Sequence, residues 1–357
     1  MKNLIDILDF SVEEIEELCT VADDIIACPE KYAECCRGKI LGTLFFEPST
    51  RTRLSFTSAM MSLGGSVLGF SAAGNTSVSK GETVGDTIRM VSAYSDIIAM
   101  RHPKEGAPIV AARVSKVPII NAGDGGHFHP SQTLTDLFTI KRHFGRLDNL
   151  TVGIAGDLKY GRTVHSLIAA MSRYENVKFV LIAPDELRLP AYVRDAHLSD
   201  GKCQVVETTD LESAIPELDI LYMTRIQEER FSNADDYARL KDSYILTDEK
   251  LKGAKDCLAV MHPLPRINEI STDVDDNPHA LYFEQAANGR FIRMALILKL
   301  LKEKNLAGKY SAEGESNPAL LCRNPHCISR TERGIKKLFA GKRCIYCDQE
   351  AGNISDI

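Results

Sequence analysis

The chain has 357 residues, enough for about two domains of ordinary size. Its composition, with 44% hydrophobic and 26% charged residues, is that of a globular protein and excludes a disordered chain. The formal net charge of −6 argues against a general nucleic-acid binder, so any anion-binding site must be a local basic pocket.

The sequence also bears on where the protein works. No apolar run approaches the roughly 20 residues of a membrane span, and the N-terminus, with one lysine and interspersed acids, is no secretory signal. Scattered cysteines are typical of free thiols in a reducing compartment. They are Cys19, Cys28, Cys35, Cys36, Cys203 and Cys257. We therefore expect a cytoplasmic protein without a membrane partner.

The first elements that the pattern predicts are an acidic helix and a buried strand. A Ser-x-x-Glu capping box at 11–14 opens the helix, and the strand covers 39–46. A second helix follows directly, because Pro48 tolerates a first helical turn and the hydroxyls of Ser49 and Thr50 cap free N–H groups. Its apolar residues recur at helical spacing as far as position 63.

The start of this second helix, Ser-Thr-Arg-Thr-Arg at 49–53, is a candidate anion site. Backbone N–H groups, the positive end of the helix dipole and guanidinium groups converge there, which suits a phosphate or a carboxylate. The alternative is an ordinary capped helix whose arginines face solvent. The occurrence of all these residues directly after a buried strand favours the anion site.

The rest of the first half alternates strands and helices. Strands are expected at 66–70, 96–100 and 118–122, and helices at 86–94 and from 131 onward. Arg101 stands at the carboxyl end of its strand, where open α/β sheets bind ligands. His129 lies at a strand-to-helix turn, which makes it a better candidate than most lone histidines. The polar loop at 72–85, which carries Ser77, Ser79 and Lys80, is either a plain surface loop or one that docks on a site.

The second half repeats the pattern. Strands are expected at 150–157, 178–183, 204–207, 219–223 and 257–261, and helices at 161–174, 190–199 and 289–301. Its glycines do not fit a dinucleotide fingerprint. Arg162, Arg225 and the His-Pro-Leu-Pro turn at 262–265 each follow a strand, as Arg101 does. We expect an α/β protein with two doubly wound parallel-sheet domains joined by helices, and a cleft between them.

A cleft with three arginines and Lys80 would suit substrates that carry several anionic groups, because Arg forks hold phosphate and carboxylate through paired hydrogen bonds. No Ser/His/Asp triad, cysteine nucleophile or carboxylate pair stands out in the body of the sequence. This pattern favours catalysis by positioning and charge stabilisation, without a covalent intermediate.

The C-terminal segment carries a separate motif. Residues 305–320 are polar and contain glycine and proline, which is typical of a linker. Two close pairs of cysteines follow, the pattern of a tetrahedral structural Zn²⁺ site. They are Cys322 with Cys327, and Cys344 with Cys347. Four free thiols or disulfides are the alternative. We expect a small zinc-binding β domain at 321–357, and no organic cofactor.

The segment at 49–53 resembles the carbamoyl phosphate signature of the aspartate and ornithine carbamoyltransferases, and the resemblance extends to about Lys304. It implies a carbamoyl phosphate-binding domain at 1–140 with a return helix at 286–304, and an amino-acid-binding domain at 141–285. By similarity, carbamoyl phosphate is bound by Ser49, Thr50, Arg51, Thr52, Arg101, His129, Gln132, Pro263 and Leu264. The members of this set with catalytic roles are Arg51, Thr52, Arg101 and His129.

The resemblance also implies an oligomer. Ser77 and Lys80 resemble the pair that enters the site from a neighbouring subunit, and this sharing makes the catalytic unit of the family a trimer. The loop is a residue shorter than in some relatives, so Ser79 is the alternative to Ser77.

The second domain selects the amino acceptor. Arg162, Arg225 and Gln227 match residues that bind the two carboxylates of L-aspartate, and Lys80 joins them. The turn from 262 has the aspartate form, where ornithine enzymes carry His-Cys-Leu-Pro. The implied reaction is attack of the aspartate amine on the carbamoyl carbon, with loss of phosphate, to give N-carbamoyl-L-aspartate for pyrimidine biosynthesis. An ornithine or other amino-acid carbamoyltransferase is the alternative.

The C-terminal segment is similar to the zinc domain of the regulatory chain of aspartate carbamoyltransferases. This implies a catalytic chain fused to a contact module, with no nucleotide-binding domain and no nucleotide allostery, in a homotrimer or a dimer of trimers. A zinc-ribbon adaptor for nucleic acid or protein is the alternative from another class. It would rest on Arg323, Arg330, Arg333, Lys336, Lys337, Lys342 and Arg343. Because the site residues of the enzyme are all present, we expect no nucleic-acid partner.

Overall fold

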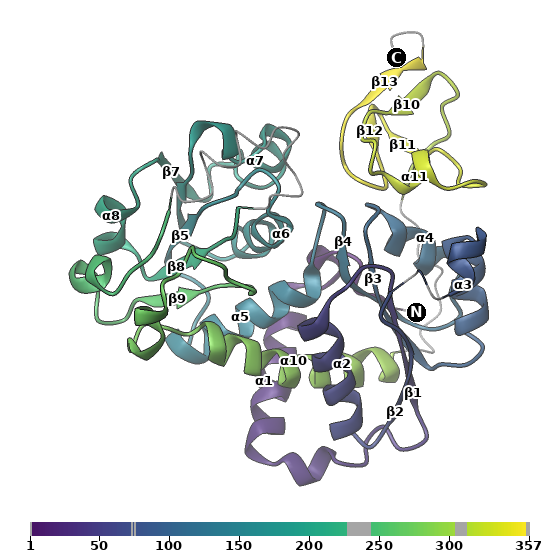
Figure 1. Cartoon of the computed structure of the whole chain (residues 1–357), viewed down its shortest axis with the longest axis horizontal. Helices are drawn as coiled ribbons and strands as arrows, with labels where there is room; N and C mark the ends of the chain where they lie inside the picture. Colours follow the sequence, from purple (N-terminus) through teal and green to yellow (C-terminus); the bar gives the residue numbers. More distant parts are fainter. Residues whose placement is uncertain (1, 73, 75, 227–243, 304–312, 355–357) are drawn as a thin grey trace. The chain divides into compact units, whose positions relative to one another are not determined.

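The computed structural model describes residues 2–72, 74, 76–226, 244–303 and 313–354 (Figure 1). The chain divides into two compact units. The first unit comprises Met1–Ser131 and Gly289–Ile357, and the second comprises Gln132–Asn288. None of the described helices is long and apolar enough to cross a membrane.

The first unit is built on a parallel sheet. Its four described strands lie in the order β2-β1-β3-β4 (Figure 1). They are β1 Ile40–Phe45, β2 Ser66–Phe70, β3 Ile97–His102 and β4 Ile119–Asp124. The helices are α1 Val12–Ala27, α2 Thr50–Ser62, α3 Val84–Val91 and α4 Ala107–Val114, with 3-10 turns at Ile7–Asp9, Pro29–Tyr32 and Ser77–Lys80. The expected strands are confirmed, because each is an apolar run bounded by turn residues.

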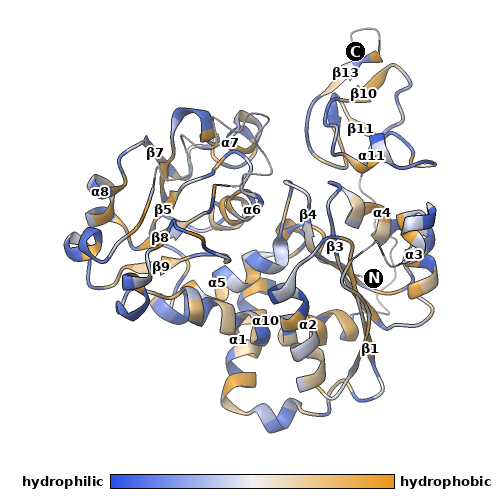
Figure 2. Ribbon diagram, viewed as in Figure 1, coloured by the Kyte–Doolittle hydropathy of each residue, from blue (hydrophilic) through white to orange (hydrophobic). Residues whose placement is uncertain are grey.

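Two of these helices show what local pattern can and cannot reveal. The capping box of α1 is confirmed, since Ser11 Oγ accepts from Glu14 N at 3.2 Å and a Glu14 carboxylate oxygen accepts from Ser11 N at 2.9 Å. Helix α4 was not expected. Its residues from Ala107 to Ala112 are all buried, so the segment is apolar all round and shows no helical period (Figure 2).

The second unit holds a second parallel sheet. Its five described strands lie in the order β7-β6-β5-β8-β9. They are β5 Thr151–Ala155, β6 Lys178–Ile182, β7 Gln204–Thr208, β8 Ile220–Met223 and β9 Ala259–Met261. The helices are α5 Pro130–Phe144, α6 Arg162–Met171, α7 Ala191–His197 and α8 Leu211–Ala214, with 3-10 turns at Asp185–Leu187, Ile215–Glu217, Glu249–Gly253 and Thr272–Asp276. Two doubly wound parallel sheets are therefore confirmed.

The last long helix, α10 Tyr282–Lys302, begins earlier than expected and crosses the division between the units. Its residues from Gly289 onward belong to the first unit. Arg293 Nη1 donates to Ser55 Oγ at 2.7 Å, and Lys299 forms ion pairs with Glu14 and Glu17 of α1. These contacts hold the C-terminal part of α10 against α1 and α2, near the beginning of the chain.

The described residues 313–354 form a small C-terminal module, coloured yellow in Figure 1. Its elements are β10 Leu320–Cys322, α11 Ile328–Thr331, β11 Phe339–Ala340, β12 Arg343–Cys344 and β13 Ala351–Asn353. Strand β10 pairs antiparallel with β13, and β11 pairs with β12. The first half of the expected linker, residues 305–312, lies outside the described residues. Glu315 already exchanges backbone hydrogen bonds with Phe339, so regular pairing begins before β10.

Candidate functional site

The strand order of the first unit places its candidate residues at one edge of the sheet. The chain runs from β1 to β2 on one side, then crosses to β3 on the other side of β1. Ligands of open α/β sheets bind at the carboxyl ends of the strands, at such a switch point. There, Phe45 of β1 lies opposite Arg101 of β3, and Phe46 N donates to Arg101 O at 2.8 Å. The turn into α2 and Arg101 are thus neighbours.

The side chain of Arg101 is held in place by two residues of this turn. Arg101 Nε donates to Glu47 Oε1 at 2.7 Å, and Nη1 donates to Ser49 Oγ at 3.2 Å. The expectation that the Ser49 hydroxyl caps α2 was wrong. Ser49 occupies the N-cap position, but its side chain makes no capping hydrogen bond and instead accepts from Arg101. The first-turn N–H groups of α2 therefore do not use this hydroxyl.

Positive charge is concentrated at this turn. Burial and the nearby guanidinium of Arg101 lower the pKa of Arg51, although much of the Arg51 side chain is exposed. Bringing two like charges together is unfavourable unless an anion compensates them. Thr52, only 8% exposed, lies on the same helix turn. Together with the helix N-terminus, these residues bring together the positive charge and the donors that suit an anion.

His129 follows β4, the strand beside β3, and is buried. Its Nδ1 lies 3.4 Å from Ser131 Oγ, and Arg293 of α10 donates to the Ser131 carbonyl at 3.5 Å. Ser77 and Lys80 lie on the 3-10 turn after β2, and both are exposed in this single chain. Ser79 donates to Thr76 O at 2.7 Å, within the same loop.

The second unit repeats the switch-point arrangement. Strand β8 lies on the opposite side of β5 from β6, and β5 and β8 run parallel. Arg162 begins the helix after β5, and Arg225 follows β8. The two strand ends are tied together, because Thr224 Oγ1 accepts from Asp157 N at 2.9 Å and donates to Ala155 O at 3.0 Å. Gln227 lies outside the described residues.

Gln132 at the start of α5 is held by a residue that the sequence had not suggested. The fully buried carboxylate of Asp136 accepts from Gln132 Nε2 at 2.8 Å, from Gln285 Nε2 at 2.6 Å and from Tyr222 OH at 3.0 Å. The sequence signal for this contact is the spacing of Gln132 and Asp136, since residues four apart on a helix share a face. Asp136 therefore fixes the Gln132 amide.

The turn after β9 is fixed by the buried imidazole of His262. Its Nδ1 accepts from Leu264 N at 2.7 Å, so the proton is on Nε2, which lies 2.8 Å from Glu269 Oε1. Burial of Glu269 alone would raise its pKa, but the hydrogen bond to His262 helps to lower it. Leu264 has φ of 50°, a left-handed conformation that is rare for a branched residue. His262 thus fixes the peptide between Pro263 and Leu264, and with it the direction of the Pro263 carbonyl.

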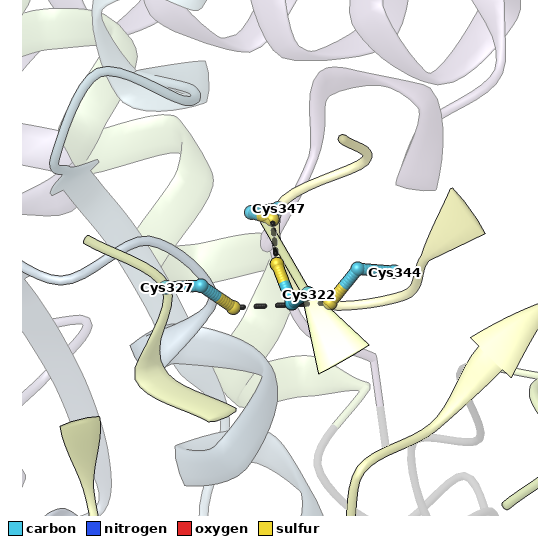
Figure 3. A group of neighbouring side chains, drawn as sticks. All are labelled: Cys322, Cys327, Cys344 and Cys347. Atoms are coloured by element: carbon cyan, nitrogen blue, oxygen red, sulfur yellow. Dashed lines mark hydrogen bonds between the residues drawn. The ribbon is translucent and has the colours of Figure 1, made fainter. Parts of the chain in front are cut away.

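The cysteines of the C-terminal module converge on one point, as Figure 3 shows. All four Sγ atoms are buried and lie within 4.8 Å of one another. They belong to Cys322, Cys327, Cys344 and Cys347. Sγ atoms are 3.4 Å apart for Cys322 and Cys347, and 3.8 Å apart for Cys327 and Cys344, so neither pair is a disulfide. Tetrahedral thiolates at about 2.3 Å from a zinc ion would be about 3.8 Å apart. The donor set and its spacing fit a metal ion.

Two family models match this chain. The model for the aspartate/ornithine carbamoyltransferase carbamoyl-P binding domain matches residues 2–142, and that for the Asp/Orn binding domain matches residues 148–300. The chain is 61% identical over 301 residues to the aspartate carbamoyltransferase catalytic subunit of Lachnoclostridium phytofermentans. It is 60% identical over 300 residues to that of Clostridium acetobutylicum. Each alignment covers 84% of this chain and 98% of the relative.

Solved structures agree with these matches. The catalytic subunit of M. jannaschii aspartate transcarbamoylase is 46% identical, with a TM-score of 0.79, over 86% of this chain and all of that one. Aspartate transcarbamoylase from Trypanosoma cruzi, in complex with carbamoyl phosphate and aspartate, is 38% identical with a TM-score of 0.79. That alignment covers 84% of this chain and 96% of the other. Neither family model extends into the C-terminal module.

Proposed function

This chain belongs to the aspartate carbamoyltransferase catalytic-subunit family, and we propose that it transfers the carbamoyl group of carbamoyl phosphate to the amine of L-aspartate. The products are N-carbamoyl-L-aspartate and phosphate, which places the reaction in pyrimidine biosynthesis. The observation that carries this proposal is the 61% identity to a catalytic subunit along 98% of its length.

The first unit supplies the groups for carbamoyl phosphate. Ser49, Thr50, Arg51 and Thr52 bind the phosphate at the N-terminus of α2. Arg101, His129 and Thr52 polarise the carbamoyl carbonyl and hold the oxyanion that forms when the amine attacks. Two observations support this proposal. The charges of Arg51 and Arg101 lie close together, and the side chain of Arg101 is oriented by its hydrogen bonds to Glu47 and Ser49.

The second unit supplies the groups for the amide and most of those for aspartate. Gln132 and the carbonyls of Pro263 and Leu264 hold the carbamoyl NH₂ group. The aspartate carboxylates are bound by Lys80, Arg162, Arg225 and Gln227, with Ser77 and Lys80 contributed by a neighbouring subunit. Support comes from the switch point between β5 and β8, where Arg162 and Arg225 follow adjacent strands.

The acceptor is tested by comparing L-aspartate and L-ornithine in an assay for the ureido product. We expect turnover with aspartate, whereas ornithine turnover would contradict the proposal. Arg162→Lys should raise KM for aspartate about tenfold or more, because lysine cannot make the paired hydrogen bonds of a guanidinium. Arg188→Lys is the matched control, since Arg188 forms an exposed pair with Asp185; a similar rise there would point to a general charge effect.

We further propose that the four module cysteines bind one structural Zn²⁺, as in the regulatory-chain zinc domain that the segment resembles. Four thiolates complete a tetrahedral shell and leave no position for water, so the ion would support folding. Metal analysis should find one zinc per chain. Cys344→Ser should lose the metal and lower the melting temperature, whereas Cys35→Ser, at an exposed free thiol, should change neither. Full metal loading of Cys344→Ser would contradict this ligand set.

The proposed assembly is a homotrimer or a dimer of trimers in the cytoplasm, where reducing conditions suit the ten free cysteines. Because the module resembles only the contact part of a regulatory chain, we expect no nucleotide effect. Activity measured with and without CTP or ATP should agree, and a strong shift with either nucleotide would count against this proposal.

A further inference from the structure

The C-terminal module packs on the N-terminal part of the first unit, within its own chain. Their apolar residues share one buried cluster, in which Ile109 and Val110 of α4 join Ile328, Phe339 and Tyr346 of the module. The packing is close, because a Cβ on Gly106 would lie 2.4 Å from Tyr346 O. Arg113 Nη1 donates to Tyr346 OH at 2.9 Å, with the guanidinium 5.5 Å from the ring centroid. The module is thus held by core-like contacts.

The polar contacts of this interface reach two turns that lie next to candidate site residues. The first is the turn after β3, a few residues beyond Arg101. Glu105 N donates to His326 O at 3.1 Å, and Ile328 N donates to Glu105 O at 2.9 Å, so the two chain segments pair like strands. The buried Glu105 carboxylate also accepts from Asn324 Nδ2 and, at 3.3 Å, from Gly126 N.

The second is the turn between β4 and α5, just before His129. Buried His127 lies between two carboxylates, with Nδ1 3.2 Å from Asp124 Oδ2 and Nε2 2.9 Å from Asp348 Oδ2 of the module. Burial disfavours its charge, but these carboxylates raise the pKa of His127 well above its usual value. Asp124 also accepts from Gly106 N at 2.8 Å and from Phe128 N at 3.2 Å. The two turns and the module therefore share one buried network.

A third contact reaches the segment after Lys80. Arg333 Nη2 donates to Gly81 O at 3.2 Å, and Glu332 Oε1 accepts from Val84 N at 2.9 Å at the start of α3. The module thus touches the chain next to Lys80, shortly after Arg101 and shortly before His129. None of these contacts involves a group that we assign to the substrates.

We propose that Asp348 and Asn324 are positioning residues, through which the module holds the His127 and Glu105 turns so that Arg101 and His129 are ordered for carbamoyl phosphate. This inference rests on the proposed function. It gives the module a role in catalysis within its own chain, beside its effect on stability. Small displacements of site groups are enough to reduce turnover strongly, so support from a neighbouring module is effective.

The test compares Asp348→Asn, His127→Gln and the double variant with the wild-type chain. The carbamoyl phosphate dissociation constant is measured by calorimetry without aspartate, and zinc content by metal analysis. We expect a constant about tenfold higher in each single variant, with zinc retained and faster hydrogen exchange at Gly126 and Phe128. The double variant should be no worse than His127→Gln alone, because that variant has already lost the contact with Asp348.

Arg113→Met is the matched control, because it removes a module contact on α4 that does not reach either turn. It should lower the melting temperature without changing the dissociation constant. Unchanged carbamoyl phosphate binding in Asp348→Asn, with faster exchange at the turn, would overturn the positioning role. Loss of zinc in that variant would also count against it, since the effect would then belong to the metal site. Failure of the wild-type chain itself to bind carbamoyl phosphate would instead overturn the proposed function.

Discussion

Arg101 is held by the carboxylate of Glu47, which stands two residues before the motif at 49–53. Glu47 and Arg101 are both largely buried, with side chains 24% and 15% exposed, so their ion pair is shielded from solvent more than a surface pair. This pairing fixes the guanidinium plane, while Nη1 reaches Ser49. Glu47 stands two residues before the motif at 49–53, but no role for it could be assigned before β1 and β3 were known to be neighbours.

Substituting Glu47 should therefore reduce turnover without removing a substrate contact. Glu47→Ala is expected to lower kcat by up to about 100-fold, because Arg101 would lose its orientation. Glu47→Gln should lose less, since its amide oxygen still accepts from Arg101 Nε. Steady-state kinetics would show this order, and Glu34→Ala, which breaks an exposed pair with Arg37, is the control. Equal effects of the two Glu47 variants would argue against an orienting role.

His102, the residue after Arg101, should make the stability of the protein depend on pH. Burial and the Lys104 ammonium lower the pKa of His102 to about 4, and its Nδ1 accepts from Lys104 N at 3.0 Å. The unfolded chain, with a pKa near 6.5, binds this proton more readily than the folded chain. The stability contribution is therefore complete above pH 6.5 and is lost as the pH falls toward 4, by about 3 kcal/mol.

Denaturant titrations of wild-type protein and His102→Asn between pH 7 and pH 4 would test this expectation. Asparagine offers an acceptor for Lys104 N but does not titrate, so the wild-type protein should lose more stability on acidification than the variant. The comparison is needed because burial raises the pKa of Asp6 to about 6, which acts in the opposite direction. Parallel pH profiles for the two proteins would exclude His102 as the source.

At the level of elements, helix α1 is defined by local chemistry. Ser11 and Glu14 satisfy each other's backbone N–H groups, and Glu14 also pairs with Lys2 and Lys299. Ser11→Ala should destabilise the protein by about 1 kcal/mol, because one first-turn N–H loses its acceptor. Ser11→Asp should restore most of that stability, as aspartate is an equally good N-cap. Thermal or denaturant unfolding measures both, and a destabilised Ser11→Asp would count against capping as the cause.

Two other helices have features that the local sequence pattern did not predict. The motif at 49–53 predicted a helix start, and α2 does begin at Thr50. The Ser49 hydroxyl, however, turns to Arg101, since a tertiary partner with positive charge is a stronger donor than a backbone N–H. Helix α4 escaped detection for a related reason, because an element buried on all sides has no polar face to mark its period.

At the level of the whole molecule, the packing of the module on its own chain allows a prediction about the number of subunits. Its apolar face is already covered by α4 of its own chain. A variant that ends at Lys309 should therefore keep the number of subunits of the full-length protein, while its melting temperature falls because that cluster becomes exposed. Native mass measurement of both proteins decides the point. A larger particle formed only by the full-length protein would show that the module joins separate assemblies of the catalytic part.

The sequence by itself determined the strands, most helices, the anion motif and the four clustered cysteines, because these depend on residues close together in the chain. It also singled out Arg101, Arg162, Arg225 and His129 as residues that follow strands. Tertiary structure alone decided strand order, and hence that β1 adjoins β3 and β5 adjoins β8 at the two switch points. It alone revealed that Glu47 meets Arg101, that Asp136 meets Tyr222 and Gln285, and that His127 meets Asp348. These partners lie far apart in sequence, and a side chain in a one-dimensional pattern carries no mark of the group that it will meet.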